Sequence, residues 1–214
     1  SLLDVTEARE RVRLEAEAKY RDELFAELNH RVKNNLQSLA SLLRLRFADV
    51  DDPAIRDMLA ASISRIQAIA MLHDQLGGSK VGQAADAEGY LAALVEALRA
   101  LHGAPEIVSI ELGRVDALAL DADALMNVGM ITAELLLNAL RHAFPRGRSG
   151  KVVVTLVSVG AAVELTVRDD GVGATQPSST PTLGMRIVRS LAERLAGSFS
   201  IETSGEGTRA SVRF

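Results

Sequence analysis

The chain contains 214 residues, of which 48% are hydrophobic and only 3% aromatic, and it has neither Cys nor Trp. The lack of cysteine excludes disulfides, thiolate nucleophiles and thiolate metal ligands. A net charge of −4 argues against a general nucleic-acid binder, because such proteins normally carry a basic surface. No apolar run approaches the ~20 residues of a membrane span. We therefore expect a cytoplasmic protein with an aliphatic core, no nucleic-acid partner and no membrane segment in this stretch.

The first part of the chain predicts an antiparallel helical hairpin. Residues from about Thr6 to Phe47 contain neither Pro nor Gly and favour one long helix. Asp51-Asp52-Pro53 predicts a turn, followed by a second helix to about Leu76. Apolar residues recur at helical spacing in both: Leu24, Leu28, Val32, Leu36, Leu39 and Leu43, then Ile55, Leu59, Ile63, Ile66, Ile69, Ala70 and Leu76. Two helices cannot bury both stripes alone, so we predict a homodimer, through residues 1–76, that forms a four-helix bundle.

The second part changes character after Gly77-Gly78-Ser79, where we place a domain boundary. Helices are expected at 90–101, from Asp121 or Asp123 to His142, and at 183–195; strands are expected at 108–112, 151–159, 163–168, 198–203 and 208–214. Helices followed by hairpins favour an α+β fold. We therefore divide the chain into a coiled-coil linker (1–23), a helical hairpin (24–80) and an α/β-sandwich domain (81–214).

His30 is the first candidate for chemistry. It lies about 200° around the predicted helix from Leu28, so it points away from the apolar stripe. Lys33 and Asn34 fall on its side one turn later. An exposed imidazole beside a cation and an amide could attack a phosphoryl group, with the cation stabilising the added negative charge. The alternative is a solvated histidine in a polar patch.

Glu134 and Asn138, within ELLLNALRHAF, are the second candidate. They are four residues apart, so both project from one side of a helix among Leu and Ala. A carboxylate and an amide oxygen suit a hydrated magnesium ion. The alternative is a pair that bridges neighbouring elements.

Two glycine-containing segments follow. Asp169-Asp170-Gly171-Val172-Gly173 comes directly after a strand, and its glycines allow close approach to a ligand. An Asp at a strand end can accept a hydrogen bond from an amino group such as that of adenine. The segment 182–188, TLGMRIV, opens a helix whose N-terminus attracts phosphate. Each pattern alone also fits a tight turn or an ordinary capped helix, and GEGT at 205–208 is most simply a hairpin turn.

In this order, ELLLNALRHAF, DDGVG, TLGMRIV and GEGT resemble the ATP-binding half of the histidine kinases. That fold is of the Bergerat or GHKL type, shared with gyrase, Hsp90 and MutL. Upstream, LNHRVKNNLQSLASLLRL resembles the phosphoacceptor segment of the sensor histidine kinases marked by His-Arg-x-Lys-Asn-Asn, which are related to the HWE group. The resemblance covers nearly all of residues 20–214.

The resemblance implies a protein-histidine kinase of a two-component system. His30 would accept the γ-phosphoryl group of ATP and pass it to an Asp of a response-regulator receiver domain. Glu134 would stand in the place of the base of related ATPases, Asn138 would hold Mg²⁺, and Lys33 and Asn34 could support transfer or dephosphorylation. The ATP site would be completed by Arg141, His142, Asp169, Gly171, Gly173, Leu183, Gly184, Met185 and Thr208.

The sequence also departs from the family pattern. Arg31 stands where many histidine kinases have an acidic residue, so the proton acceptor for His30 is open, with Glu134 as one candidate. Thr182 replaces a glycine, and the short segment between Gly173 and Leu183 predicts a reduced ATP lid. The chain lacks the Trp-x-Glu motif of the HWE group and is placed beside that group.

Three alternatives remain open. One is a phosphotransfer scaffold with an inactive ATP domain, and another is a phosphatase-dominant sensor in which Asn34 orients a water. A Bergerat ATPase or protein-serine kinase is the third, although such proteins lack a helical hairpin with an exposed His.

The N-terminal LLDVTEARERVRLEAE resembles the junction that follows PAS-type sensor domains, or is simply a charged arm. Because the chain begins at Ser1, we expect a fragment with a PAS-type sensor domain upstream.

Overall fold

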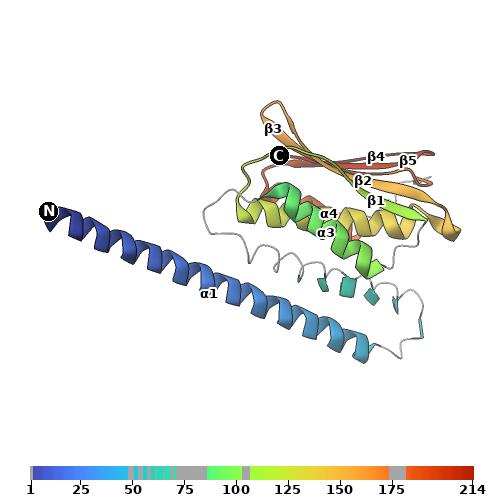
Figure 1. Cartoon of the computed structure of the whole chain (residues 1–214). Helices are drawn as coiled ribbons and strands as arrows, with labels where there is room; N and C mark the ends of the chain where they lie inside the picture. The colour runs from blue at the N-terminus through green and yellow to red at the C-terminus, as the bar shows by residue number, and fades with distance from the viewer. Residues whose placement is uncertain are drawn as a thin grey trace.

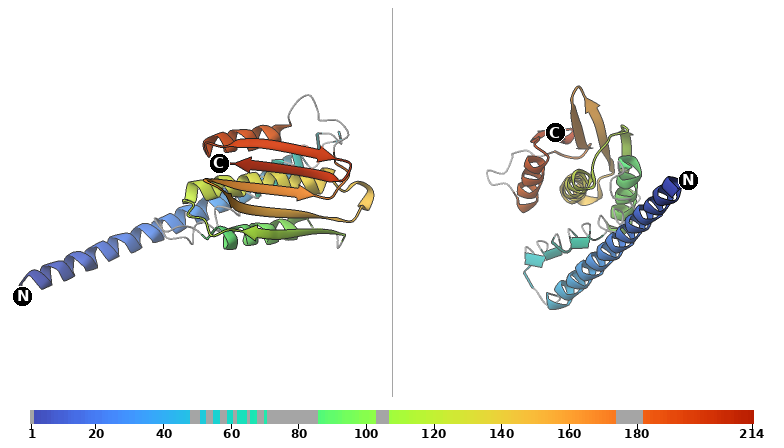
Figure 2. Two further views of the ribbon diagram at one scale, coloured as in Figure 1. Left: turned by 90° about the horizontal axis from the view of Figure 1, so that it is seen from above. Right: turned by 90° about the vertical axis from the view of Figure 1, so that its left-hand side faces the viewer.

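The computed structural model describes residues 2–47, 51–52, 55–56, 59–60, 62–64, 66–67, 70, 86–102, 107–173 and 182–214. A long N-terminal helix, α1 (Leu2–Arg46), lies outside an α/β domain formed by the second part of the chain (Figures 1 and 2). This arrangement is the predicted fold class, a helical region followed by an α/β domain.

The second helix of the predicted hairpin is present where the chain is described, because the described residues from 55 to 70 are helical. The Arg44 guanidinium donates to Gln67 Oε1 at 2.9 Å, which ties α1 to this segment. Ala40, Ile63 and Ala70 are buried. Ile55, expected to face inward, is instead 43% exposed. It lies in the first helical turn, where the Asp52 carboxylate accepts from its N–H at 3.4 Å. The expected end near Leu76 and the boundary at 77–79 lie outside the described residues.

The α/β domain is one five-stranded sheet with its helices packed on one face (Figures 1 and 2). Its elements in chain order are α3 (Ala87–His102), β1 (Val108–Val115), α4 (Ala122–His142), the 3₁₀ turn η1 (Pro145–Gly147), β2 (Gly150–Val159), β3 (Ala162–Asp169), α5 (Leu183–Arg194), β4 (Ser198–Ser204) and β5 (Gly207–Arg213). The strand order is β1-β2-β3-β5-β4. Strands β1 and β2 are parallel, and the other neighbours are antiparallel.

Helix α4 lies at the centre of the domain. Asp121 caps it, because the Asp121 carboxylate accepts from Ala124 N at 2.7 Å. By length and composition α4 could cross a membrane, but most of its apolar part is buried inside the domain, as in the core helix of a globular protein. It connects β1 to β2, and a parallel pair needs such a crossover. The aliphatic core expected from the composition therefore gathers around α4.

The predicted helices and strands of the α/β domain are confirmed, with bounds that differ by up to three residues. The parallel pairing of β1 with β2 and the turn η1 were not predicted. The two parallel strands are separated in the chain by α4, and local sequence patterns do not show which distant strand a given strand will pair with. The hairpin predicted at Gly160-Ala161 is present, and Gly160 adopts the positive φ that such a turn requires.

Candidate functional site

A cavity of about 330 Å³ opens between α4, the start of α5 and strands β3, β4 and β5. Its walls are mostly apolar: Leu135, Ala139, Ala143, Val167, Met185, Ile201 and Ala210. Its polar groups come from Asn138, His142, Asp169, Thr182 and Thr208, and Gly173 also borders it. A mostly apolar cleft with a few converging polar groups suits a flat heterocycle that carries hydrogen-bonding edges.

Asp169 is the buried carboxylate of this cavity, with 6% of its surface exposed. Its Oδ1 accepts from the backbone N–H groups of Gly171 at 3.0 Å and Thr208 at 3.2 Å. Burial raises the pKa of the carboxyl above its usual range, and the two backbone donors oppose that shift. Both contacts use one oxygen, which leaves Oδ2 available to accept a hydrogen bond from a ligand.

Two glycines keep this part of the backbone close to its neighbours. Gly171 approaches the end of α4 so closely that a Cβ would lie 2.4 Å from the Ala143 carbonyl oxygen. Gly173 has a φ of +61°, and a Cβ there would lie 1.8 Å from Ser204 O. Val172 N also donates to Ala143 O at 2.9 Å. The glycines of DDGVG are therefore required by close packing around the cavity.

The adjacent Asp170 has a different role. Its Oδ1 accepts from Lys151 N at 2.7 Å, at the start of β2, and its backbone carbonyl accepts from Arg148 at 3.1 Å. These contacts hold the β2 end against the β3 end. Asp170 does not line the apolar cavity. Of the two adjacent aspartates, Asp169 therefore lines the cavity and Asp170 connects the ends of two strands.

The residues predicted on α4 are only partly brought together. Asn138 and His142 line the cavity. Glu134 is buried one turn before Asn138 and is not among the lining residues, and Arg141 is exposed and also outside the lining. Among the described residues, no three His, Asp or Glu side chains converge as a metal site. Asn138 therefore offers one amide oxygen at the cavity, with no carboxylate cluster beside it.

The start of α5 borders the cavity as expected. The Thr182 hydroxyl caps the helix by accepting from Met185 N at 3.4 Å, and both residues line the cavity. Leu183 is exposed and Gly184 is buried, and neither lines it. The predicted reduced lid falls largely on residues 174–181, which lie outside the described residues. Thr208, at the start of β5, also lines the cavity and donates its N–H to the Asp169 carboxylate.

Sequence reasoning predicted Met185 at the site but missed the other apolar walls. Ile201 on β4 and Ala210 on β5 face one another across the strand pair, and both line the cavity. One signal was available, because Ile201 is a large aliphatic residue in a strand whose other residues are mostly polar. Alternation along β4 could have placed it on the helix-covered side of the sheet.

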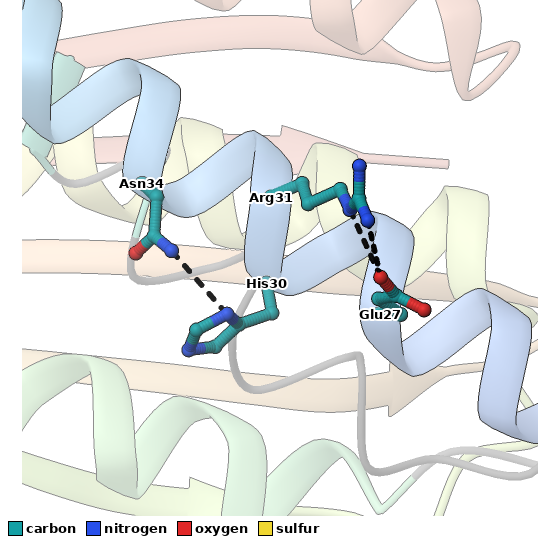
Figure 3. Close-up of polar contacts among 4 residues, drawn as sticks. All are labelled: Glu27, His30, Arg31 and Asn34. Atoms are coloured by element: carbon teal, nitrogen blue, oxygen red, sulfur yellow. Dashed lines mark hydrogen bonds and ion pairs between the residues drawn. The ribbon is translucent and has the colours of Figure 1, made fainter.

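The predicted phosphoacceptor His30 is exposed on α1. Figure 3 shows the Asn34 side chain turned toward its ring, with Asn34 Nδ2 3.3 Å from His30 Nδ1. Arg31 points to another side of the helix and engages Glu27, with guanidinium-to-carboxylate distances of 2.5 and 3.0 Å. The cation that replaces the usual acidic neighbour is thus paired with a carboxylate one turn earlier.

Comparison with known proteins identifies the class. Residues 27–102 match the family described as histidine kinase, and residues 125–214 match the family described as histidine kinase-, DNA gyrase B- and HSP90-like ATPase. The chain therefore belongs to the histidine kinases and carries the two parts of their core. The second match is to a domain of the ATP-binding type, and the cavity around Asp169 lies within it.

Particular relatives agree with this class. The chain is 33% identical over 213 residues to the sensor histidine kinase PdtaS of Mycobacterium tuberculosis, covering 95% of this chain and 40% of that protein. It is 29% identical over 196 residues to blue-light-activated histidine kinase 2 of Erythrobacter litoralis, covering 87% of this chain and 55% of that protein. The chain thus spans about half or less of the length of these relatives.

One solved structure extends the likeness to three dimensions. The histidine kinase domain of a blue-light-activated histidine kinase from Erythrobacter litoralis matches with a TM-score of 0.63 at 26% identity. The match covers 92% of this chain and 95% of that domain. The likeness includes the helical region as well as the α/β domain, which a match to the ATPase family alone would not require.

Proposed function

We propose that this chain is the kinase core of a sensor protein, which phosphorylates His30 from ATP and passes the phosphoryl group to an Asp of a response regulator. The observation that carries the proposal is the buried Asp169 carboxylate, held by Gly171 and Thr208 at the floor of an apolar cavity. The same chain presents an exposed histidine beside an amide on α1. A nucleotide site and an acceptor are the two parts that autophosphorylation needs.

The cavity fits the adenine base. Its apolar walls, among them Leu135, Val167 and Ile201, would pack against the faces of the ring. Asp169 Oδ2 would accept a hydrogen bond from the exocyclic amino group. A buried carboxylate that lacks such a donor is costly, so a site built in this way discriminates against rings that carry a carbonyl in place of the amine.

The phosphates would extend toward the α4 and α5 side of the cavity. Asn138 and His142 lie on the last turns of α4, and Thr182 caps the start of α5, whose N-terminal N–H groups favour anions. The donor set fits magnesium in a limited sense, because Mg²⁺ is commonly held by one or two protein oxygens together with substrate phosphates. Asn138 would supply that protein oxygen, and the ion would neutralise charge on the transferring phosphoryl group.

Transfer would join the two parts of the chain. A ring nitrogen of His30 forms a bond to the γ-phosphorus as the bond from that phosphorus to the β–γ bridging oxygen breaks, and ADP leaves. Because α1 lies outside the α/β domain, the domain must move onto the acceptor helix of its own chain or of a partner chain (Figure 1). Positioning of this kind supplies most of the catalysis in phosphoryl transfer.

A homodimer through the helices 1–76 is part of the proposal. Several large apolar residues of α1 are exposed in the single chain: Leu24, Leu28, Val32, Leu39, Leu42 and Leu45. A second copy that covers them would complete a four-helix bundle. His30 lies about 200° around the helix from Leu28, so it would stay accessible. The arm before residue 24 would receive input from a PAS-type sensor domain, and the family places such a core in the cytoplasm.

The proposal is tested by incubating the chain with γ-labelled ATP and magnesium. We expect acid-labile, base-stable label on the parent chain and none on His30→Ala. Asp169→Asn should lose most labelling because ATP binding is weakened about tenfold to a hundredfold, the range expected for one hydrogen bond to a charged group. Asp170→Asn is the matched control, since Asp170 does not line the cavity, and it should retain ATP binding and labelling.

The outcomes separate the alternatives. Nucleotide binding without label, together with rapid loss of phosphate from a phosphorylated receiver domain, would contradict kinase function and favour a phosphatase-dominant sensor. The absence of both nucleotide binding and label would favour a phosphotransfer scaffold. Label that persists on His30→Ala would show that another residue is the acceptor.

A further inference from the structure

Asn34 contacts the proposed phosphoacceptor through one particular nitrogen. The side-chain amide lies one helical turn after His30 and reaches Nδ1 at 3.3 Å, while the other ring nitrogen, Nε2, points away from Asn34 (Figure 3). Both residues are exposed. Asn34 therefore contacts the exposed ring at Nδ1 and makes no contact with Nε2, which we take as the nitrogen that meets an incoming phosphoryl group.

The direction of this hydrogen bond is linked to the ring nitrogen that carries the proton. A neutral imidazole has one N–H and one nitrogen with an available lone pair. When the Asn34 NH₂ group donates to Nδ1, the ring proton must reside on Nε2, and Nε2 cannot attack phosphorus. When the amide turns by half a rotation about its last side-chain bond, its oxygen accepts from Nδ1–H and leaves the Nε2 lone pair available.

We propose that Asn34 is a positioning residue that selects the tautomer of His30, and thereby switches the nucleophile between a resting and a reactive form. The orientation in Figure 3, with Nδ2 toward Nδ1, corresponds to the resting form. The inference rests on the proposed function of His30 as phosphoacceptor. It answers a question left by Arg31, because the residue directly after His30 is not a carboxylate that could fix the proton on Nδ1.

The carboxylate nearest to His30 on the preceding turn is already paired, so the amide of Asn34 is the group that contacts the ring. Glu27 is the carboxylate one turn before His30, and its Oε1 is engaged by both the Nε and Nη2 atoms of Arg31. An asparagine differs from a carboxylate in that it both donates and accepts, so it can hold either tautomer. An acidic residue in its place would hold only the reactive one.

The proposed step balances without a further reactant. In the reactive form the Nε2 lone pair forms the N–P bond while the bond from the γ-phosphorus to the bridging oxygen breaks, and ADP leaves with that electron pair. The proton stays on Nδ1, hydrogen-bonded to the Asn34 oxygen, and is released to solvent from the phosphorylated ring. Asn34 accepts a hydrogen bond in this step and never the proton itself.

The experiment reads the tautomer and the reactivity of His30 separately in the full chain. Nitrogen-15 NMR of labelled histidine reports which ring nitrogen is protonated, at a pH above the titration of the ring in each variant. Phosphoramidate, a small phosphodonor that needs no ATP site, then reports the rate and position of phosphorylation. The variants are Asn34→Asp, which can only accept, and Asn34→Leu, which has a similar size and no polar atoms.

We expect the proton mainly on Nε2 in the parent chain. Asn34→Asp should move it to Nδ1 and speed Nε2 phosphorylation by phosphoramidate by about twofold to tenfold, the range that one exposed hydrogen bond can select. Asn34→Leu should show the ratio of an unrestrained imidazole. Asn35→Asp adds the same charge at an exposed neighbouring position about 100° further around the helix and should leave both readouts unchanged.

The proposal is wrong if the tautomer ratio is the same in the parent, Asn34→Asp and Asn34→Leu chains, or if Asn35→Asp shifts it equally. A purely structural role for Asn34 would change the helix content of α1 and leave that ratio unmoved. Failure of ATP labelling in the parent would instead contradict the proposed kinase function, while the NMR result would still decide the role of Asn34.

Discussion

The α/β domain and the helix α1 differ in how much of their large apolar side chains they bury. In the α/β domain many large aliphatic side chains, among them Leu136 and Ile131, are fully buried. On α1, Leu28 and Leu39 leave 53% and 51% of their surfaces exposed. The first region buries most of its large apolar side chains within one chain, whereas the second leaves several of them exposed in the single chain.

Their polar groups differ in the same sense. Asp169 is held by two backbone N–H groups inside a packed cavity. His30 contacts a single exposed side chain that can rotate. A nucleotide needs a site that is already formed before it binds, whereas an acceptor that must meet two different phosphoryl partners benefits from being exposed. The comparison therefore separates a buried carboxylate held by backbone groups, at the proposed nucleotide site, from an exposed side chain at the proposed acceptor.

The largest expected effect comes from breaking the apolar face of α1. The double variant Leu28→Asp/Leu39→Asp should weaken dimerisation at least about 100-fold, because each buried Leu side chain contributes about 1.5–3 kcal/mol and a symmetric dimer buries each twice. Sedimentation equilibrium measures this change. Ile107→Asp is the control, since Ile107 is a similarly exposed aliphatic residue of the α/β domain. A double variant that remains as dimeric as the parent would show that another face is used.

A pair of leucine truncations sharpens the same comparison through stability. Leu136→Ala should lower the free energy of unfolding of the α/β domain by about 2–5 kcal/mol, because the side chain is fully buried on α4. Leu42→Ala removes a side chain of α1 that is not part of the α/β core, and it should change the free energy of unfolding of the α/β domain by less than about 0.5 kcal/mol. Urea denaturation followed by circular dichroism measures both. Equal losses in the two variants would mean that the regions unfold as one unit.

The pH dependence of stability tests the fixed site. The pKa of Asp169 is raised in the folded protein, chiefly by burial. The folded state therefore holds this proton more tightly than the unfolded state, and stability falls as pH rises from the ordinary Asp pKa through the raised one. Asp169→Asn removes that penalty, so relative to the parent it should gain a small increment in Tm at pH 7 that disappears near pH 4. Thermal unfolding of both proteins across this range is the measurement, and a difference that does not depend on pH would contradict it.

Much of this organisation could be predicted from residue patterns. Asp121 followed by an apolar run marked the start of α4, and the β-branched runs on either side of Gly160 marked a hairpin. These signals are local, because caps, turns and alternation involve residues close in the chain. The parallel partner of β1 is not local, and the sequence offered no sign of it.

The candidate site shows the same limit. Asp169 and Gly173 could be recognised because tight backbone geometry requires their residue types. Alternation along β4 could place Ile201 on the helix-covered side of the sheet, but not at the cavity, since an aliphatic residue in a strand fits a core wall as well as a cavity wall. Glu134 was expected as a base near the reacting groups. It is buried one turn before Asn138 and does not line the cavity, so its role stays a prediction.

The smallest effect is expected where the two regions meet along the chain. Tyr90 lies in the first turn of α3, and its hydroxyl is buried without a hydrogen-bond partner among the described residues. Burial also raises the pKa of this hydroxyl, so it stays protonated and must still lose its water partners on folding. Tyr90→Phe removes the polar atom and keeps the packed ring, and the variant should unfold within about 1 kcal/mol of the parent, on the stabilising side. A clear destabilisation in urea would contradict this prediction, because it would mean that the hydroxyl makes a hydrogen bond in the folded protein that the phenylalanine ring cannot replace.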